Sequence, residues 1–560
     1  MLSAQQQEIV NASHKLRLSP ARTMVVRAGP GSGKTHTVIA LIKSHIENGM
    51  APNRICALTF TRRAAEELKV RLGPEYGEEV FTGTIDAAAL ELVRMTEPNA
   101  QILSPANALV LFSHVCSMVG VKSTSRLFYE YQEWREKKTE NNPEMEKLDQ
   151  MYWSLLKLGQ IYDYQSVLLR AIETADDRPR IGFDLIILDE AQDTSELQWR
   201  LIEMMVHEEL AVLVAVGDVN QTIYSWRNAK PEIFEAYRRR CLSLPLVECY
   251  RCSPPIVDYA NRLISLNDDA IADVASRRTG VFEPVQVIEG DTLLAVHVIL
   301  GMAYAYDDIA ILCRTNRTVG FIENVLSGMG YPVNAVRALE ARESFLAVAA
   351  QFAIHKDNPV IALLFSHYAT KGELLGVLGL RNLTSISWES LVLELSQTEA
   401  GKALIEYMSQ CQDEFCVFAE ALVYLQSIPE FAEETRRLKR RYGPMVIRQA
   451  ISALNTPEDL PKPQNEITVC TVHQAKGLEW NAVIVADLAE GKFPSEMALR
   501  DEDGIQEERR CMYVAVTRPK DVLILLADPK KPSQFILSKE IIDAGKVLGE
   551  AEKAIRSAGF

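Results

Sequence analysis

The sequence predicts an α/β protein with two parallel β-sheets, each interrupted by a mainly helical insertion. Two observations favour this fold. Short apolar runs rich in β-branched residues alternate with helical stretches, which is typical of parallel sheets covered by helices. These runs fall into two groups along the chain of 560 residues, so two sheets of ordinary size are favoured over one very large sheet.

Four buried strands are expected in each group, and they define two sheet domains. The N-terminal strands are Thr23–Arg27, Ile55–Thr61, Phe183–Leu188 and Leu210–Val216. The C-terminal strands are Ile309–Arg314, Ile467–His473, Ala482–Asp487 and Val522–Ala527. We therefore assign residues 1–85 and 176–245 to the first domain, and residues 246–341 and 456–560 to the second.

Two long segments between the strands differ in composition. Residues 86–175 and 342–455 are rich in Leu, Ala, Glu and Arg at helical spacing and contain few strand-like runs. Each is expected to be a helical insertion into one sheet domain. A proline-rich stretch, Thr456–Pro463, then leads back to the next expected strand.

The composition excludes several classes of protein. With 48% apolar and 24% charged residues, the chain is neither disordered nor collagen-like. Its net charge of −15 argues against a protein that coats nucleic acid through a uniformly positive surface. A local positive groove is still compatible with this net charge. The ten cysteines are scattered, and the close pair Cys249 and Cys252 lacks the second half of a zinc site.

The N-terminal residues and the lengths of the apolar runs suggest where in the cell the protein is located. The segment Met1–Glu8 has no basic stretch followed by an apolar one, and no apolar run approaches the roughly 18 residues that a membrane helix needs. We therefore expect a cytoplasmic protein that does not enter a membrane. Its thiols are expected to be reduced.

The first expected strand runs into a glycine-rich loop, Ala28–Thr35, which a helical pattern follows. In this context the glycines allow backbone N–H groups to face a polyphosphate, Lys34 reaches the β and γ phosphates, and Thr35 ligates Mg²⁺. The alternative is a glycine-rich turn that binds no nucleotide. The expected nucleotide-binding residues are Gly29, Pro30, Gly31, Ser32, Gly33, Lys34, Thr35 and His36.

Two adjacent carboxylates, Asp189 and Glu190, follow the third expected strand. Such a pair can divide the work of hydrolysis, with Asp189 holding Mg²⁺ and Glu190 polarising the attacking water. An acidic pair alone is weak support, because many such pairs only complement a helix N-terminus. Together with the phosphate loop, the pair predicts an NTPase.

Five sequence blocks resemble one helicase family. The block Gly217–Arg227 resembles the third motif of the UvrD, Rep and PcrA group of superfamily 1 DNA helicases. The other blocks follow the same order as in that family and span nearly the whole chain. They are Thr59–Ala65, Tyr250–Arg251, Thr471–Glu479 and Glu507–Arg518.

The resemblance implies that the two sheets are the RecA-like domains 1A and 2A, that the insertions are 1B and 2B, and that ATP and Mg²⁺ bind between the sheets. Gln6 would read the adenine and Tyr250 would stack on it. Gln221 would sense the γ-phosphate. The residues that would reach the nucleotide from 2A are Glu479 and two arginine fingers, Arg251 and Arg518, which stabilise transition-state charge when the cleft closes.

The family resemblance also implies a path for single-stranded DNA across both sheet domains. Three aromatic residues match base-contacting positions, and aromatic rings give sequence-tolerant stacking. Phe60 is equally compatible with a place in the core. The expected DNA-binding residues are Phe60, Tyr224 and Trp226 for bases, and Arg63, Arg227 and His473 for phosphates.

The leading functional hypothesis is an ATP-dependent 3′ to 5′ translocase that acts on single-stranded DNA and on tailed duplexes. One alternative is a DNA-stimulated ATPase that unwinds weakly, strips proteins from DNA or serves a partner nuclease. Another is a nucleotide-gated DNA-binding subunit of a repair, phage or defence complex. The complete hydrolytic set Glu190, Gln221, Arg251 and Arg518 argues against the last of these.

The segment after the last motif bears on strand separation. Full-size relatives carry a β-hairpin pin there, with an aromatic residue that abuts the duplex fork. In this chain the stretch Leu525–Phe535 has no aromatic residue before Phe535, and its prolines leave room for a turn but not for a long hairpin. We therefore expect weak unwinding by the isolated chain.

Overall fold

The computed structural model describes most of the chain, and it divides into two compact units. One unit comprises Met1–Ile85, Pro179–Arg337 and Pro461–Phe560, and the other comprises Asp86–Arg178 and Ala338–Leu460. Within the described residues, no helix is long and apolar enough to cross a membrane. The described residues are 2–17, 22–137, 142–176, 183–206, 211–224, 229–290, 308–335, 341–356, 358–378, 380, 388–413, 416–447, 449–451 and 465–537.

The first sheet lies in the larger unit and has six parallel strands in the order β3-β2-β6-β7-β1-β8. The register pairs Thr23 with Leu213 and Ile55 with Leu185, so the phosphate loop and the Asp189–Glu190 turn leave the same edge of the sheet. The strands are β1 (Thr23–Ala28), β2 (Ile55–Thr59), β3 (Phe81–Thr84), β6 (Leu185–Leu188), β7 (Val212–Gly217) and β8 (Leu242–Leu246).

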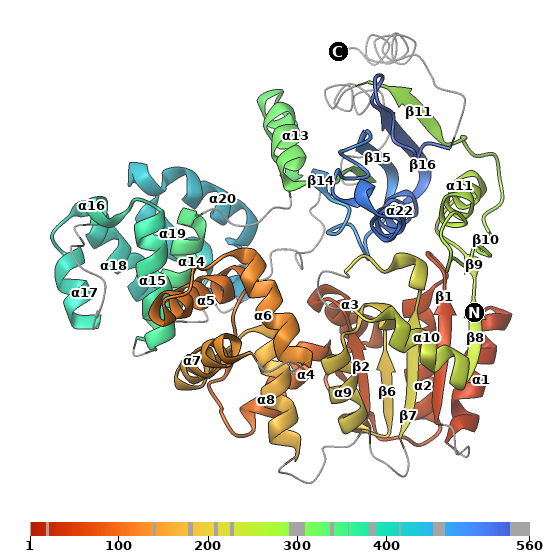
Figure 1. Cartoon of the computed structure of the whole chain (residues 1–560), viewed down its shortest axis with the longest axis horizontal. Coiled ribbons are helices and arrows are strands. Elements are labelled where there is room, and N and C mark those ends of the chain that lie inside the picture. The colour runs from red at the N-terminus through yellow and green to blue at the C-terminus, as the bar shows by residue number, and fades with distance from the viewer. Residues whose placement is uncertain are drawn as a thin grey trace. The chain divides into compact units, whose positions relative to one another are not determined.

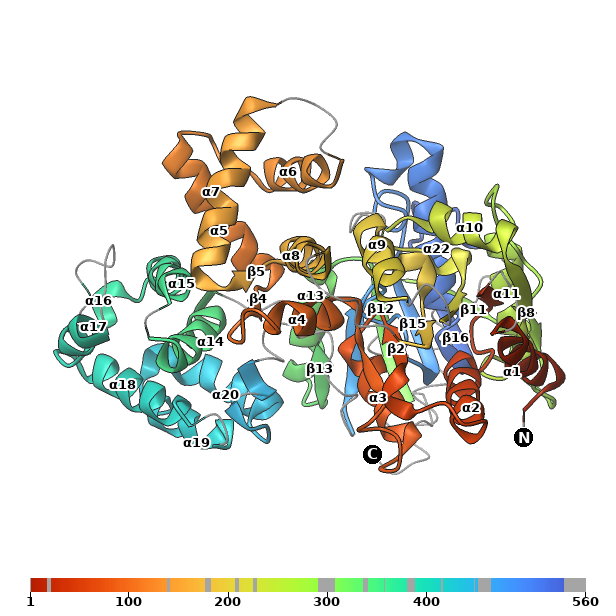
Figure 2. The ribbon, with the colours of Figure 1, turned by 90° about the horizontal axis from the view of Figure 1, so that it is seen from below.

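Helices cover both faces of this sheet. Figure 2 shows α1, α2 and α3 on one side and α9 and α10 on the other. Apolar side chains of α1 and α2, such as Ile9 and Leu41, pack with Val26 and Val214 from the strands in one core. The helices are α1 (Ala4–Leu16), α2 (Lys34–Glu47), α3 (Arg62–Leu72), α9 (Glu196–Met205) and α10 (Pro231–Arg240).

The second sheet belongs to the same unit and also has six parallel strands, in the order β11-β16-β15-β12-β14-β13. Figure 1 shows β11, β14, β15 and β16 of this sheet. Alternate residues of its strands face two cores, so that Leu312 packs with α11 and α22 whereas Ile311 packs with α13. The elements are β11 (Gln286–Glu289), β12 (Ile309–Cys313), β13 (Val333–Ala335), β14 (Ile467–Thr471), β15 (Trp480–Leu488), β16 (Pro519–Ala527), α11 (Pro254–Ile264), α13 (Asn316–Gly328) and α22 (Glu502–Val516). A short parallel pair, β9 (Glu248–Cys249) and β10 (Ala275–Ser276), lies outside both sheets.

The predicted fold class, two parallel-sheet domains with many helices, is confirmed. The eight predicted strands all form, although several bounds were wrong. For example, β2 ends at Thr59 because Thr61 instead caps α3 by accepting a hydrogen bond from the Ala64 N–H. Four further strands of the two six-stranded sheets were missed: β3, β8, β11 and β13. All four lie at sheet edges, where partial exposure weakens the apolar pattern.

The second unit is mainly helical and brings the two inserted segments together. Tyr368 of α15 donates a hydrogen bond to Asn107 of α5 (2.9 Å), and Asn358 donates one to the Gly159 carbonyl (2.8 Å). A two-strand pair joins β4 (Gln101–Ile102) to β5 (Ile161–Tyr162). The helices are α4 (Ile85–Arg94), α5 (Pro105–Val119), α6 (Ser125–Lys137), α7 (Pro143–Gly159), α8 (Tyr164–Asp176), α14 (Ala341–Ile354), α15 (Pro359–Lys371), α16 (Leu375–Leu378), α17 (Trp388–Leu395), α18 (Glu399–Cys411), α19 (Phe418–Leu422) and α20 (Ala432–Tyr442).

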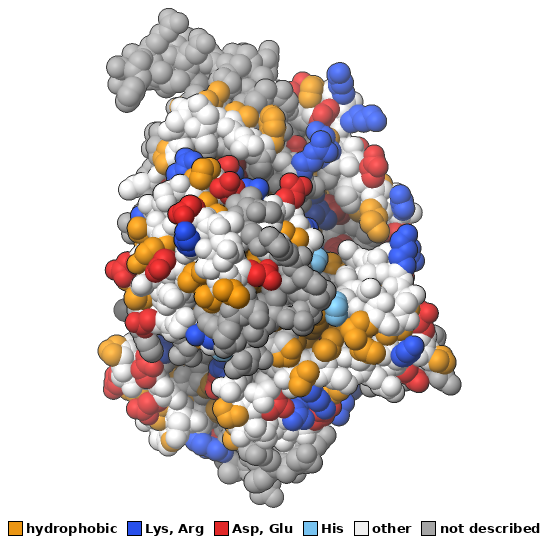
Figure 3. Space-filling model, turned by 90° about the vertical axis from the view of Figure 1, so that its left-hand side faces the viewer, with side chains coloured by type: hydrophobic (Ala, Val, Ile, Leu, Met, Phe, Trp, Pro, Cys, Tyr) orange, Lys and Arg blue, Asp and Glu red, His pale blue; other side chains and the backbone are white. Residues whose placement is uncertain are grey.

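Charged side chains of both signs mix on the molecular surface. On the face shown in Figure 3, Lys and Arg side chains alternate with Asp and Glu side chains. Interspersed charge suits a protein whose contacts with charged ligands are local.

A buried arginine organises α6 and α7 of the helical unit. The Arg135 side chain is 2% exposed and pairs with Asp149 at 2.8 Å. It also donates to the Ser166 hydroxyl (2.8 Å) and lies over the Trp153 ring, 5.1 Å from its centroid. Removing one partner of a buried pair leaves an uncompensated charge, which is costly.

We expect Arg135→Met to lower the local stability of α6 and α7 by about 3–5 kcal/mol, because Asp149 loses its buried partner. Hydrogen exchange followed by mass spectrometry on peptides from these helices measures this loss. Arg126→Met is the matched control on the same helix: Arg126 is 89% exposed and pairs with Glu130, so its loss should cost only about 0–1 kcal/mol. Equal effects of the two substitutions would contradict the prediction.

Candidate active site

The glycine-rich loop joins the end of β1 to the start of α2. Gly31 (φ 65°) and Gly33 (φ 79°) adopt the left-handed conformation, which favours glycine. The Ser32 hydroxyl closes the loop by donating to the Gly29 carbonyl (2.8 Å). Because α2 begins at Lys34, its free N–H groups and this lysine meet at one place, which suits a polyphosphate.

The two predicted carboxylates lie at the same sheet edge, directly after β6. Glu190 has a φ of 53°, an uncommon conformation for a residue with a side chain, and its N–H donates to Asp189 Oδ1 (3.0 Å). Lys34 Nζ lies 3.4 Å from Glu190 Oε1. The structure therefore brings Lys34, Asp189 and Glu190 together at this edge of the sheet.

The two carboxylates differ in their affinity for protons. Burial, followed by the negative charge of Glu190, raises the pKa of Asp189. Burial acts in the same direction on Glu190, but the positive charges of Lys34 and Lys476 hold its pKa below the usual range. Glu190 is therefore ionised, and Asp189 stands where a cation would relieve its cost of ionisation.

A chain of amide side chains leads from Glu190 to the third motif. Gln192 donates to Glu190 Oε2 (2.7 Å) and accepts from the Asp218 N–H (2.9 Å). The Asp218 carboxylate in turn accepts from Gln221 Nε2 (2.7 Å). Gln221 is 2% exposed, so this network is shielded from water.

Lys476, which follows β14 of the second sheet, reaches into the same network. Its ammonium group forms an ion pair with Asp193, and it donates to the Gln221 carbonyl (2.7 Å). The Lys476 side chain is 6% exposed and the Asp193 side chain 0%. The second sheet thus contributes a buried positive charge to the acidic end of β6.

The two predicted arginines belong to the domain of the second sheet. Arg251 lies shortly before α11, and Arg518 lies directly before β16. Arg518 is buried and donates to Gln221 Oε1 (3.2 Å). Arg251 donates to Glu479 (2.6 Å), which Lys520 also contacts (3.1 Å). Burial alone would raise the pKa of Glu479, but Arg251 and Lys520 lower it to about 2.

The predicted adenine-binding residues both touch the phosphate loop. Gln6 donates to the Ser32 carbonyl (3.4 Å), and the Tyr250 N–H donates to the Gly31 carbonyl (2.9 Å). Gln6 is buried, whereas the Tyr250 side chain remains exposed. His36 is exposed on the first turn of α2.

Three of the predicted DNA-binding residues form a cluster. The Phe60 and Tyr224 rings stack with centroids 4.6 Å apart, and the Tyr224 hydroxyl donates to the His473 carbonyl (3.0 Å). Tyr224 is only 5% exposed and packs with the core of the second sheet. Arg63 lies nearby in sequence on the first turn of α3. The remaining two predicted DNA contacts, Trp226 and Arg227, lie outside the described residues.

Sequence reasoning missed four polar residues of this site, namely Gln192, Asp193, Asp218 and Lys476. Asp218 and Lys476 lie within the blocks that resemble the helicase motifs, and Gln192 and Asp193 come shortly after the Asp189–Glu190 pair. That proximity was the available signal. Burial of their side chains distinguishes them from surface polar residues, and for Asp193 and Lys476 it involves a contact between the two sheets.

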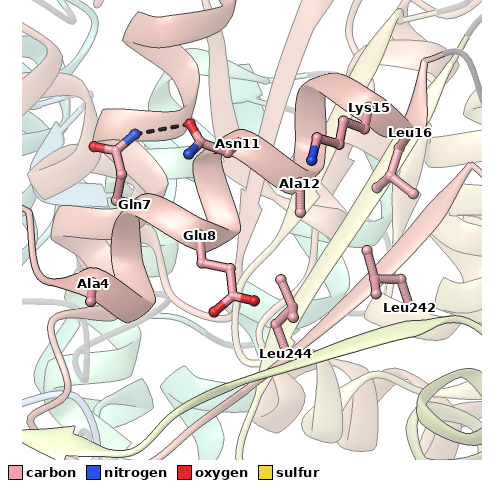
Figure 4. Close-up of a pocket in the computed structure, with 9 residues that line it drawn as sticks. All are labelled: Ala4, Gln7, Glu8, Asn11, Ala12, Lys15, Leu16, Leu242 and Leu244. Carbon is pink, nitrogen blue, oxygen red and sulfur yellow. Dashed lines mark hydrogen bonds between the residues drawn. The ribbon is translucent and has the colours of Figure 1, made fainter.

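A separate hollow lies on the outer edge of the first sheet. It has a volume of about 670 Å³ and is lined by α1 and β8, including Glu8, Lys15 and Leu244 (Figure 4). None of the predicted site residues lines it. The hollow is therefore distinct from the residues around the phosphate loop.

Comparisons with known proteins agree with this geometry. A family model described as an AAA domain matches residues 6–227, and a model described as the UvrD-like helicase C-terminal domain matches residues 406–528. The chain is 23% identical to the ATP-dependent DNA helicase PcrA of Leuconostoc citreum, over 93% of this chain and 83% of the relative. For the PcrA of Bacillus subtilis the identity is 25%, over 90% of this chain and 80% of the relative.

A third relative, which carries the name DNA helicase II, also matches this chain over most of its length. The chain is 24% identical to the DNA helicase II of Haemophilus influenzae, over 96% of this chain and 88% of the relative. The two family models cover the phosphate loop, the Asp189–Glu190 pair and the Lys476 and Arg518 motifs. The chain is therefore similar, along most of its length, to the UvrD-like superfamily 1 ATP-dependent DNA helicases.

Proposed function

We propose that this helicase hydrolyses ATP with Mg²⁺ and moves 3′ to 5′ along single-stranded DNA. In this proposal Lys34 holds the β and γ phosphates, and Thr35 and Asp189 bind Mg²⁺. Glu190 orients and polarises the attacking water. The ionised state of Glu190, which Lys34 and Lys476 stabilise, supports this role.

The observation that carries the proposal is the link between the nucleotide residues and the aromatic pair. Arg518 and Lys476 of the second sheet both contact Gln221, which lies three residues before Tyr224. In the proposed cycle, closure of the sheets around ATP brings Arg518 and Arg251 to the developing charge. The same movement shifts Tyr224 and its neighbours along the DNA.

The DNA track in this proposal combines stacking with phosphate contacts. Phe60, Tyr224 and Trp226 supply aromatic faces. The positive or polar partners for phosphates are Arg63, Arg227 and His473. A short track of this kind needs only local positive charge, so it is compatible with an acidic protein.

A second candidate function is a DNA-stimulated ATPase that unwinds weakly and remodels nucleoprotein or serves a partner nuclease. The segment after β16 favours it. The Asp528 carboxylate accepts from the Lys530 and Lys531 N–H groups (2.9 Å each), which closes a tight turn. Phe535 is 1% exposed and packs against Phe493, so this aromatic ring is part of the core rather than a wedge.

The third possibility, a nucleotide-gated DNA-binding subunit, would bind both ligands without sustained turnover. ATPase measurements with and without single-stranded DNA separate it from the other two. DNA-stimulated hydrolysis argues for a motor, whereas tight DNA binding with no stimulated hydrolysis argues for the gated subunit.

Lys34→Ala and Glu190→Gln should both abolish hydrolysis but differ in nucleotide binding. Lys34→Ala removes a charged phosphate contact and should weaken ATP affinity about 10- to 100-fold. Glu190→Gln leaves the phosphate loop intact, so it should retain affinity while kcat falls about 100-fold or more. Calorimetry and steady-state turnover measure both quantities, and Glu196→Gln, at an exposed position on α9, is the control. Near-normal turnover in Glu190→Gln would sink the role assigned to it.

Trp226→Ala should weaken single-stranded DNA binding by about 1–3 kcal/mol, because one stacking face is lost. The loss should appear in DNA affinity and in DNA-stimulated turnover rather than in turnover without DNA. Fluorescence anisotropy with labelled oligonucleotide measures the affinity. Phe321→Ala, at an exposed aromatic residue on α13, is the control. A less stable variant with unchanged DNA affinity would make Trp226 a core residue instead.

The isolated chain should translocate well on single strands but unwind duplex poorly. Each stacked base-pair step costs on the order of 1.4 kcal/mol to open, and no wedge follows β16 within the described residues to Leu537. Streptavidin displacement from single-stranded DNA is compared with unwinding of a duplex of about 20 base pairs, carrying either a 3′ or a 5′ tail. Efficient unwinding would reveal another wedge, and a preference for the 5′ tail would reverse the proposed polarity.

A further inference from the structure

Tyr250 is held at its backbone and at its hydroxyl group, yet much of the residue stays exposed. Its backbone N–H donates to the Gly31 carbonyl of the phosphate loop (2.9 Å). Its hydroxyl donates to the Glu248 carboxylate (2.7 Å). The residue nevertheless remains 46% exposed. An aromatic ring held in this way is a preformed surface for a planar ligand.

Glu248 is itself held in place. It lies on β9, which pairs with β10 through Ala275, and its side chain is only 14% exposed. Arg277, directly after β10, forms an ion pair with the Glu248 carboxylate and donates its backbone N–H to the Cys249 carbonyl (2.8 Å). The hydrogen bonds from Tyr250 and then from Arg277 hold the pKa of Glu248 below its usual range. Glu248 thus remains a charged acceptor.

The residue before β9 is tied to the start of α1, where Gln6 donates to the Ser32 carbonyl of the phosphate loop. The Val247 N–H donates to Gln5 at the start of α1 (3.1 Å), beside Gln6. A Cβ added at Gly31 would lie 2.5 Å from the Arg251 Cβ, so the Tyr250 segment packs directly on the loop. The Tyr250 ring therefore has a fixed position relative to the phosphate-binding backbone.

We propose that Glu248, secured by Arg277, is a positioning residue that holds the Tyr250 ring ready to stack on the nucleobase of ATP. This inference rests on the proposed function, in which Tyr250 contacts the adenine. Glu248 does not touch the nucleotide in this proposal and acts only through the Tyr250 hydroxyl. Its contribution is preorganisation, because the ring does not have to be immobilised when ATP binds.

The proposal predicts that loss of Glu248 weakens the binding of ATP but changes neither kcat nor the binding of a polyphosphate without a base. Glu248→Leu should raise the Kd and KM for ATP about three- to tenfold, the size expected when one side chain loses its preorganised conformation, and should leave kcat within about twofold. Glu248→Gln should retain most of the affinity, because its amide oxygen can still accept from Tyr250. Inorganic tripolyphosphate, which lacks a base, should bind all variants equally.

A double-mutant cycle tests whether Glu248 acts through Tyr250. Tyr250→Phe keeps the ring and removes the hydroxyl, so it should weaken ATP binding as much as Glu248→Leu does. The double variant should then be no weaker than the weaker of the two single variants. Calorimetry with ATP and with tripolyphosphate gives the affinities, and thermal unfolding tests the fold. Glu283→Leu, at an exposed position on the segment before β11, is the matched control.

Three outcomes would overturn the proposal. In the first, the fold-losses of ATP affinity in the two single variants multiply in the double variant. In the second, kcat falls as far as the affinity for ATP does. In the third, the variants lose affinity for tripolyphosphate as well as for ATP. Tyr250→Ala separates this failure from failure of the adenine role. If Tyr250→Ala binds ATP normally, Tyr250 does not stack on the base at all. If it binds weakly while Glu248→Leu binds normally, only the positioning role is wrong.

Discussion

The negative charge gathered at the end of β6 is the constraint on which the arrangement of both sheets depends. Asp189, Glu190 and Asp193 lie within one short turn, with Asp193 buried and the other two half-buried, and removing such charges from water is costly without compensating charge. Lys34 supplies such charge from the phosphate loop and Lys476 supplies it from the second sheet. The contact between the sheets is therefore electrostatic at its centre and belongs to the site itself.

This arrangement couples occupancy of the phosphate loop to the position of the second sheet. A bound polyphosphate would bring further negative charge and compete with Glu190 for Lys34. Arg518 and Lys476 already contact Gln221, so any change in charge at the first sheet is felt by groups of the second. Buried polar networks respond in this way because few water molecules are present to screen them.

The sequence predicted the central strands and the two adjacent carboxylates that follow β6, and the reason lies in the surroundings of these residues. β2, β6, β7, β12 and β14 are buried along their whole length, so they read as continuous apolar runs. The missed strand β8 is mostly exposed and contains Pro245, and neither feature suggests a strand. In the site, Lys34 and Glu190 belong to recognisable motifs. Gln192 and Lys476 contribute through buried tertiary contacts, with Glu190 and Asp218 for Gln192 and with Asp193 and Gln221 for Lys476, which no local pattern encodes.

The joint packing of the two inserted segments has a consequence for how the chain is made. One segment ends at Arg178 and the other begins at Ala338, yet Tyr368 and Asn107 meet in one compact unit. The ribosome must add the whole stretch from Pro179 to Arg337 between them, which at about 5–20 residues per second takes on the order of 10 s or longer. During that interval the faces of α5 and α7 that later meet α15 await their partner. The nascent helicase therefore has a period in which chaperones would have an apolar surface to recognise.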